Sequence, residues 1–241
     1  QRSSFVKNGS NMRAIILSGR SDIVIQVKRS ARSKRLSLRV SSLDGRITLT
    51  APPKVPERQL QAFIAERESW LRQNLDKLPA PSAIALGNSL PILGVEHQIA
   101  SGASHRVSHG GGVVQVPFDK PKPAARLQGY LKALARDHLV EESDKFAARL
   151  GMEYARLSLR DTRSRWGSCT QDKALMYSWR LVLAPFDVLS YVAAHEVAHL
   201  KFMDHSAQFW DQVGDLYGEY EAPRAWLKAQ GASLHRFQFV D

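Results

Sequence analysis

Residues 185–205 have the sequence PFDVLSYVAAHEVAHLKFMDH, and this stretch decides the fold of the chain. A proline opens it, and the residues that follow place apolar side chains on most sides of a helix. A helix of this composition is buried. His195 and His199 lie four residues apart, so both imidazoles would point to one side of the helix. The stretch therefore predicts a buried helix with two histidines on one face.

Three possible zinc ligands and a carboxylate stand within eleven residues, as His195, Glu196, His199 and His205. A buried Glu between two His residues is costly unless a divalent metal compensates for its charge. Three protein ligands leave a fourth position for water, and zinc lowers the pKa of that water to about 7. We therefore expect zinc held by the three histidines, with Glu196 as the catalytic base.

The step from His199 to His205 equals that of the metzincin motif, in which a third histidine follows the first pair. Phe202, however, stands where metzincins have a glycine that ends the helix. No methionine follows His205, so the Met-turn of that class is missing as well. The chain is therefore not a metzincin.

The third ligand is a choice between His205 and a later carboxylate. His205 can reach the metal if residues 204–206 form a turn before a helix over residues 207–217. Glu219 and Glu221 are the competing ligands, on the plan in which a Glu from a later helix closes the site. Neutral imidazole suits zinc, and a nearby glycine and proline disfavour a helix around the two Glu residues, so the sequence favours His205.

Several further segments resemble one known family. They are residues 161–169 (DTRSRWGSC), residues 178–185 (SWRLVLAP), the histidine helix and residues 205–210 (HSAQFW). Residues 29–36 and 87–94 show the same resemblance, which therefore extends over nearly the whole chain from about residue 20. The family is that of the YgjP-like metal-dependent hydrolases, relatives of the SprT-like and WLM zinc metallopeptidases. Ser178 and Ala207 differ from its usual Asn and Pro, and neither is a candidate ligand.

The resemblance implies a zincin-like domain in which His195, His199 and His205 bind zinc and Glu196 is the base. In such α+β peptidases a long helix, an antiparallel sheet and the metal helix enclose a cleft. The edge strand of that sheet can pair with an extended peptide, and the resemblance assigns this edge to residues 163–169. A zinc metallopeptidase that acts on a peptide or protein substrate is therefore the leading expectation.

Three further side chains are candidates for binding substrate. Arg165 and Arg180 can grip a carboxylate, carbonyl or phosphate oxygen, and the alternative for each is a structural ion pair. Trp166 is the third candidate. Cys169, the single cysteine, excludes an internal disulfide and is a poor candidate for a nucleophile beside a metal site. The run of glycines after His109 predicts a flexible turn.

The hydrophobic pattern predicts three parts. Residues 1–20 are expected to be a disordered lead or an extraneous remnant, residues 21–119 a β-rich region with one helix, and residues 120–241 the zincin-like domain. Residues 22–51 suggest a three-stranded meander with a hairpin turn at Asp44-Gly45. The expected helix and short strands that follow are residues 55–78, 84–86, 90–93, 97–100 and 113–116.

Residues 119–123 have the composition of a linker between the second and third parts. The third part is expected to begin with a long amphipathic helix over residues 124–150, which packs across the histidine helix. The strands expected between these two helices are residues 155–160, 163–169 and 174–182.

The formal charge of +11 favours a polyanionic partner. Basic residues concentrate in residues 28–39, where one strand would have a basic face. That face is either a solvated edge that resists aggregation or a surface for nucleic acid or nucleotide. Two other functions therefore stay open, a zinc-dependent phosphoanhydride or nucleotide hydrolase and a nucleic-acid-binding module with a structural metal.

No apolar run approaches the roughly 20 residues that span a bilayer, and no secretory signal opens the chain. A cytoplasmic protein with no membrane partner is expected.

Overall fold

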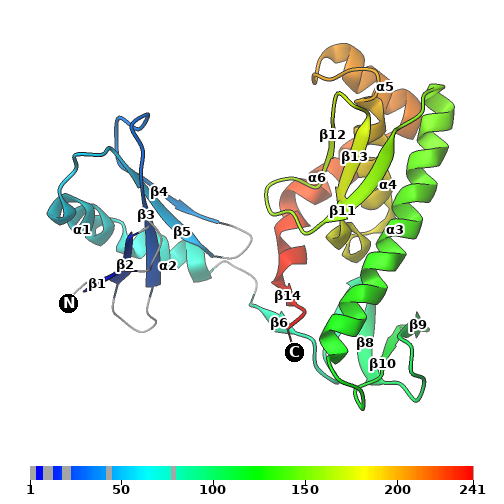
Figure 1. Cartoon of the computed structure of the whole chain (residues 1–241), viewed down its shortest axis with the longest axis horizontal. Helices are drawn as coiled ribbons and strands as arrows, with labels where there is room; N and C mark the ends of the chain where they lie inside the picture. The colour runs from blue at the N-terminus through cyan, green and yellow to red at the C-terminus, as the bar shows by residue number, and fades with distance from the viewer. Residues whose placement is uncertain (1–3, 8–12, 18–22, 42–44, 77–79, 241) are drawn as a thin grey trace. The chain divides into compact units, whose positions relative to one another are not determined.

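The computed structural model of the chain describes residues 4–7, 13–17, 23–41, 45–76 and 80–240. The chain divides into two compact units, residues 1–80 and 81–241, each with its own hydrophobic core (Figure 1). The sequence placed the boundary near residue 119. It lies earlier because strand residues such as Ile92 and Val114 pack in one core with Leu127 of the long helix.

The first unit contains a five-stranded sheet of order β1-β2-β3-β5-β4. Its strands are β1 (Ser4–Lys7), β2 (Arg13–Leu17), β3 (Ile23–Arg29), β4 (Ser37–Val40) and β5 (Ile47–Ala51). Two of them lie within residues 1–20, which the sequence assigned to a disordered lead. The difference has a physical cause, since Ile15 and Leu17 on β2 alternate with less buried neighbours and enter the core.

The three strands expected from residues 22–51 are present, but they do not form a meander. β5 pairs with β3 in parallel and with β4 in antiparallel orientation, so β5 lies between them. β5 buries Ile47, Leu49 and Ala51 almost completely, whereas side chains of β4 are at most half-buried, so β4 occupies the edge. The expected β4–β5 hairpin is confirmed, and Asp44 of its predicted turn lies outside the described residues.

Two helices, α1 (Glu57–Glu66) and α2 (Glu68–Asp76), replace the single helix expected over residues 55–78. The helix breaks at Arg67, whose φ of −103° and ψ of 5° leave the helical region. The break lets Leu71 join Leu60 and Ile64 in the core of the first unit, while Trp70 stays 40% exposed.

The second unit begins with a four-stranded sheet of order β7-β8-β10-β9. Its strands are β7 (Ser89–Ile92), β8 (Val95–Ser101), β9 (Ser108–Gly110) and β10 (Val113–Val116). They confirm the strands expected near residues 90–93, 97–100 and 113–116. The glycines after His109 complete the β9–β10 hairpin. Residues 84–86 are not a strand, and the short β6 (Ser82–Ala83) instead pairs with β14 (Phe237–Gln238) near the end of the chain.

The long helix α3 (Pro123–Leu150) agrees with the predicted helix over residues 124–150, and its C-cap Gly151 has the left-handed φ of 69°. The three-stranded sheet beyond it has the order β11-β13-β12, with strands β11 (Arg156–Arg160), β12 (Gly167–Cys169) and β13 (Ala174–Ser178). This sheet is mixed rather than antiparallel as expected, because β11 runs parallel to β13.

Helix α4 (Phe186–Ala198) follows a short 3-10 helix (Trp179–Leu183) and begins after Pro185, as the sequence predicts. Helices α5 (Ala207–Tyr217) and α6 (Glu221–Gln230) follow it. Among the described residues, no helix is long and apolar enough to cross a membrane. Two helices therefore frame the centre of this unit, α3 across its length and α4 through its core.

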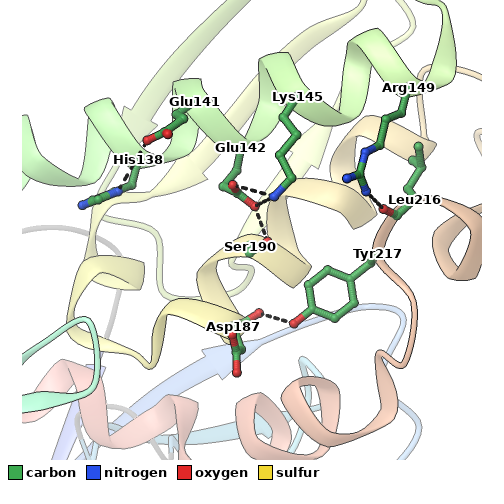
Figure 2. A network of polar contacts seen from close by, with 9 residues as sticks. All are labelled: His138, Glu141, Glu142, Lys145, Arg149, Asp187, Ser190, Leu216 and Tyr217. Carbon is green, nitrogen blue, oxygen red and sulfur yellow. Dashed lines mark hydrogen bonds and ion pairs between the residues drawn. The ribbon is translucent and has the colours of Figure 1, made fainter.

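A buried polar network joins α3 to α4 (Figure 2). Glu142 of α3 is 4% exposed and accepts hydrogen bonds from the hydroxyl of Ser190 on α4 and from the ammonium of Lys145, whose Nζ lies 2.9 Å from both carboxylate oxygens. A buried carboxylate needs such partners. The network fixes α4 against α3 about one and a half turns before His195.

Candidate metal centre and cleft

The C-terminal end of α4 brings His195, Glu196 and His199 to one place. The last residue of the helix is Ala198, and His199 follows as its C-cap. The two imidazoles lie on neighbouring turns, with ring centroids 5.0 Å apart. Glu196 points to a different side of the helix from this pair. The four-residue spacing of His195 and His199 is what places both imidazoles on one face of the helix.

His205 joins the pair through the turn after α4. Asp204 Oδ1 accepts the backbone N–H of Ser206 at 3.2 Å, and α5 begins at the next residue. The turn places His205 Nε2 3.2 Å from His195 Nε2. One nitrogen from each of His195, His199 and His205 lies within 4.8 Å of the others. The described structure thus brings together the three histidines that the sequence predicted as ligands.

The donor set fits zinc. Two nitrogens that each lie about 2.0–2.1 Å from one tetrahedral zinc are about 3.3 Å apart, close to the 3.2 Å between His195 and His205. Among the described residues, neither Glu219 nor Glu221 belongs to the cluster, and Glu221 lies 3.4 Å from Arg224 in an ion pair. Three imidazoles without a carboxylate are the ligands that zinc accepts in open sites.

Protein contacts fix how the two helix histidines present their nitrogens. His199 Nδ1 donates to the carbonyl of Phe202 at 2.8 Å, which leaves Nε2 as the acceptor for a metal. Phe202 does not adopt the left-handed φ for which metzincins use a glycine, so a phenylalanine is accommodated at this position. The ring of His195 is held by packing, with its centroid 4.9 Å from Phe209 and 5.5 Å from Trp210.

The surroundings keep both imidazoles neutral. Burial, and next the neighbouring His199 and His205, lower the pKa of His195 to about 3. Burial likewise lowers the pKa of His199, against the effect of its hydrogen bond to Phe202. Only neutral imidazole binds a metal. The two residues are therefore in the ligand form at neutral pH.

The carboxyl group of Glu196 lies against the backbone of β12. A Cβ added at Gly167 would meet Glu196 Cγ at 2.5 Å and Oε1 at 2.6 Å, so only glycine leaves room for this side chain. Burial raises the pKa of Glu196 to about 8, while the charge of Arg165 and the backbone N–H of Cys169 act in the opposite direction. A cation held by the histidines would further favour the carboxylate.

A cleft of about 440 Å³ opens over these groups. One wall is β12, the edge strand of its sheet, and the loop before it, residues 161–166. Arg165 in this loop is exposed and lines the cleft. The complete lining is Ser164, Arg165, Gly167, Ser168, Cys169, His195, Glu196, His199, Met203 and His205.

The sequence indicated the cleft strand, but four residues that line the cleft were not singled out. Gly167 could have been found, because an isolated glycine in a strand pattern marks a close approach by another group. Ser164 and Ser168 carry no such signal. Met203 is 51% exposed and lines the cleft, yet a methionine near a histidine motif has no specific meaning in one sequence.

One protein-family model matches most of the chain, and the matched range includes the residues of this site. The model of the YgjP-like metallopeptidase domain matches residues 34–230. The chain belongs to the YgjP-like family. As a YgjP-like metallopeptidase domain it is a metal-dependent peptidase, and the matched residues extend from the first unit to the end of α6.

One solved structure is similar to part of the YgjP-like chain. It is the metallopeptidase zymogen of Pyrococcus abyssi abylysin, with a TM-score of 0.33 and 18% sequence identity over 40% of this chain and 92% of that chain. No curated protein matches the sequence.

Two of the substrate-binding candidates in this YgjP-like chain have other partners. The guanidinium of Arg180 is buried, binds Asp161 at 2.7 and 3.1 Å, and donates to the carbonyls of Leu234 and Phe237 at 3.1 Å. This is the structural ion pair that the sequence left open. Neither Arg180 nor Trp166 lines the cleft.

Trp166 packs against the C-terminal segment of the YgjP-like chain instead. Its ring centroid lies 5.4 Å from that of His235, and a Cβ at Gly231 would meet the indole at 3.1 Å. Cys169 does line the cleft, but burial and the nearby Glu196 raise the pKa of its thiol to about 11. A protonated thiol is a weak nucleophile. Cys169 is therefore not an alternative catalytic nucleophile in this cleft.

Proposed function

We propose that the chain is a zinc-dependent peptidase whose metal is held by His195, His199 and His205. The observation that carries the proposal is the convergence of these three imidazoles within 4.8 Å beside a buried glutamate in a cleft. A closed structural zinc site would need a fourth protein ligand. Among the described residues the cluster contains three, which supports an open, catalytic position.

Zinc bound there would supply a Lewis acid that polarises the scissile carbonyl and makes water a nucleophile near neutral pH. Glu196 is placed to take a proton from the attacking water and to hand it to the leaving amine. Its contact with Gly167 fixes the carboxyl group, and the backbone N–H of Cys169 favours its charged form. Burial raises the pKa of Glu196, so its carboxylate is a stronger base than an exposed one.

The edge position of β12 supports binding of an extended peptide. An edge strand offers unpaired backbone groups, and a peptide can add to it as a further strand. Such a peptide would cross the cleft beside Glu196, because Gly167 of β12 contacts that side chain. Arg165 is exposed in the loop before β12 and can bind a carbonyl or carboxylate oxygen of the substrate.

The decisive experiment is Glu196→Gln. We expect the variant to keep its metal, because Glu196 is not a ligand, and to lose roughly 100-fold or more in kcat, as loss of a general base does. Metal content is measured by mass spectrometry and turnover with a mixed peptide library. Glu153→Gln, a change at an exposed glutamate of the same unit, is the matched control and should retain full activity. A fully active Glu196→Gln variant would refute the assignment.

The ligand set has a separate test. His205→Ala should lose most of its zinc, because two imidazoles alone bind the ion weakly. Glu219→Gln should keep its zinc, since Glu219 is exposed and outside the histidine cluster. The reverse order of metal contents would move the third ligand to the later carboxylate.

A further inference from the structure

The positive charge of the chain is concentrated in the first unit. Residues 1–80 contain 16 Lys and Arg against 6 Asp and Glu, a formal charge of +10. Residues 81–241 contain 18 against 17, a formal charge of +1. The metal site lies entirely in the nearly neutral part. The charge therefore needs an explanation separate from the peptidase site.

One face of the five-stranded sheet carries polar side chains. The opposite face packs on α1 and α2 in the core of the unit. Because strand residues alternate between faces, Gln26 and Lys28 of β3 lie on the polar face, away from buried Ile25 and Val27. Arg39 is paired with Thr48, and Thr48 with Gln26. The next row across the same strands is Ser37, Thr50 and Lys28.

The loop from β3 to β4, residues 30–36, adds three exposed basic side chains at the Lys28 end of this face, namely Arg32, Lys34 and Arg35. Backbone contacts hold the loop, since Ser30 N–H donates to Ala51 at 2.9 Å and the Ser33 hydroxyl donates to the carbonyl of Arg35 at 2.8 Å. We call the surface of Lys28, Arg32, Lys34, Arg35 and Arg39 the basic surface.

The basic surface has no acidic partner among the described residues, where the ion pairs involve other side chains. Arg29 is different, because its guanidinium donates to the carbonyls of Pro53 at 2.7 Å and Val55 at 2.9 Å and so holds the loop before α1. Five cations that are not used within the fold remain available for an external anion.

The neighbouring side chains favour phosphate over a membrane. Threonine, serine and glutamine donate hydrogen bonds to phosphate and sugar oxygens. A surface that inserts into a membrane carries large apolar or aromatic side chains beside its cations. Among the described residues of this unit, the exposed large apolar side chains are Val24 and Trp70. Val24 is a single apolar side chain on the polar face, four residues before Lys28, and Trp70 belongs to α2 on the other side of the sheet.

We propose that the basic surface binds the phosphate backbone of nucleic acid. Strands β2 to β5 place no aromatic side chain on the polar face, so bases have nothing to stack on along these strands. Contacts are then made to phosphates and are independent of base sequence. This binding uses residues other than those of the peptidase site, so a test of one function does not depend on the other.

The test uses the full chain and a fluorescent DNA duplex. Affinity is measured by anisotropy between about 50 and 200 mM salt, where each phosphate contact contributes about 0.9 to the slope of log K against log salt. The variant Arg32→Gln, Lys34→Gln, Arg35→Gln should bind more weakly, and its slope should be smaller by up to about 3.

The matched control removes the same charge elsewhere in the unit, with Lys54→Gln, Arg58→Gln and Arg67→Gln, three exposed residues in or next to α1. It should keep the slope of the unchanged protein. Thermal unfolding of all three proteins checks that they fold. Equal losses in both variants, absence of binding, or tighter binding to phosphatidylserine vesicles or polyglutamate than to DNA would overturn the proposal.

Discussion

Gly167 sets the position of the proposed base. In a strand, glycine normally weakens packing because it has no side chain. Here its missing Cβ is the space that Glu196 occupies, with Cγ and Oε1 within 2.6 Å of the position a Cβ would take. The backbone of β12 is held by its pairing with β13, so a Cβ added at Gly167 would force the Glu196 side chain to move. The absence of a side chain at Gly167 therefore allows the Glu196 carboxyl group to lie where it does.

Gly167→Ala should displace the Glu196 carboxyl group and lower kcat by about 100-fold, as a misplacement of about 1 Å can do. Metal content should be unchanged, because the atoms nearest to a Cβ at Gly167 belong to Glu196 and not to the histidines. The control is Gly129→Ala on α3, where a Cβ meets nothing within 4 Å and alanine is the better helix former. Equal activity of the two alanine variants would show that the close contact is irrelevant to catalysis.

At the scale of elements, the loop that carries Arg165 is anchored at both of its ends. Asp161 at its start binds Arg180, and Trp166 at its end packs on the C-terminal segment. Thr162 Oγ1 also donates to the carbonyl of Arg165 at 2.7 Å. The two residues that the sequence suggested for substrate binding, Trp166 and Arg180, therefore act on the cleft through the loop that they hold.

Asp161→Asn should destabilise the chain by about 1–2 kcal/mol at pH 7, a value reduced because the carboxylate is partly exposed. Burial alone would raise the pKa of Asp161, but the hydrogen bond and charge of Arg180 hold it below its usual range. The stabilisation is therefore complete above the unfolded pKa of about 4 and is lost as pH falls through the lower folded value.

Urea unfolding at pH 7 and at acidic pH measures this difference, with Asp211→Asn at an exposed residue of α5 as the control. The gap between Asp161→Asn and the unchanged protein should close in acid. A gap that persists below the folded pKa would mean that the ion pair is not its source.

Helices α3, α4 and α5 could be predicted closely from the sequence, but the order of the strands in the sheets could not. Helix α6 was missed as well, because it begins at Glu221, where a nearby glycine and proline disfavour a helix. Pro185 and Ser206 mark where α4 and α5 begin, and Gly151 marks where α3 ends, because caps act within a few residues. The spacing of the histidines likewise predicted that His195, His199 and His205 would lie together. Strand order depends on pairing between distant segments, and the Arg180 partners Leu234 and Phe237 lie more than fifty residues away, so neither followed from local pattern.

At the scale of the whole molecule, one strand arrangement occurs three times. β3-β5-β4, β8-β10-β9 and β11-β13-β12 each place the second strand in sequence at the edge and the third in the middle. In each set the first and third strands in sequence pair in parallel, and the second and third form an antiparallel hairpin. The loop that enters the edge strand carries basic residues in both units, as Arg32-Ser33-Lys34 and Arg163-Ser164-Arg165.

Two separate cores predict two responses to metal removal. A chelator should lower the melting temperature of the second unit by several degrees, because a ligand that binds only the folded state stabilises it, and all three histidines lie in this unit. The first unit should be unaffected. In Trp70→Phe the remaining four tryptophans all lie beyond residue 81, so their fluorescence reports the second unit alone.

Calorimetry with and without chelator then assigns the other transition to the first unit. His195→Ala should show no shift on chelation, since it lacks one ligand. A chelator effect of the same size in His195→Ala would place the responsible ion elsewhere.

The pairing of β6 with β14 has a consequence for the connectivity of the second unit. Ser82 lies opposite Phe237 in a parallel ladder, so the chain enters this unit and reaches its last strand at one place (Figure 1). Chain ends that lie together can be joined without distorting the fold, and new ends can be opened at an exposed hairpin turn. The glycine turn at residues 111–112 offers such an opening. The histidine cleft could thus be carried by a circularly permuted protein in which the order of its elements along the chain is different.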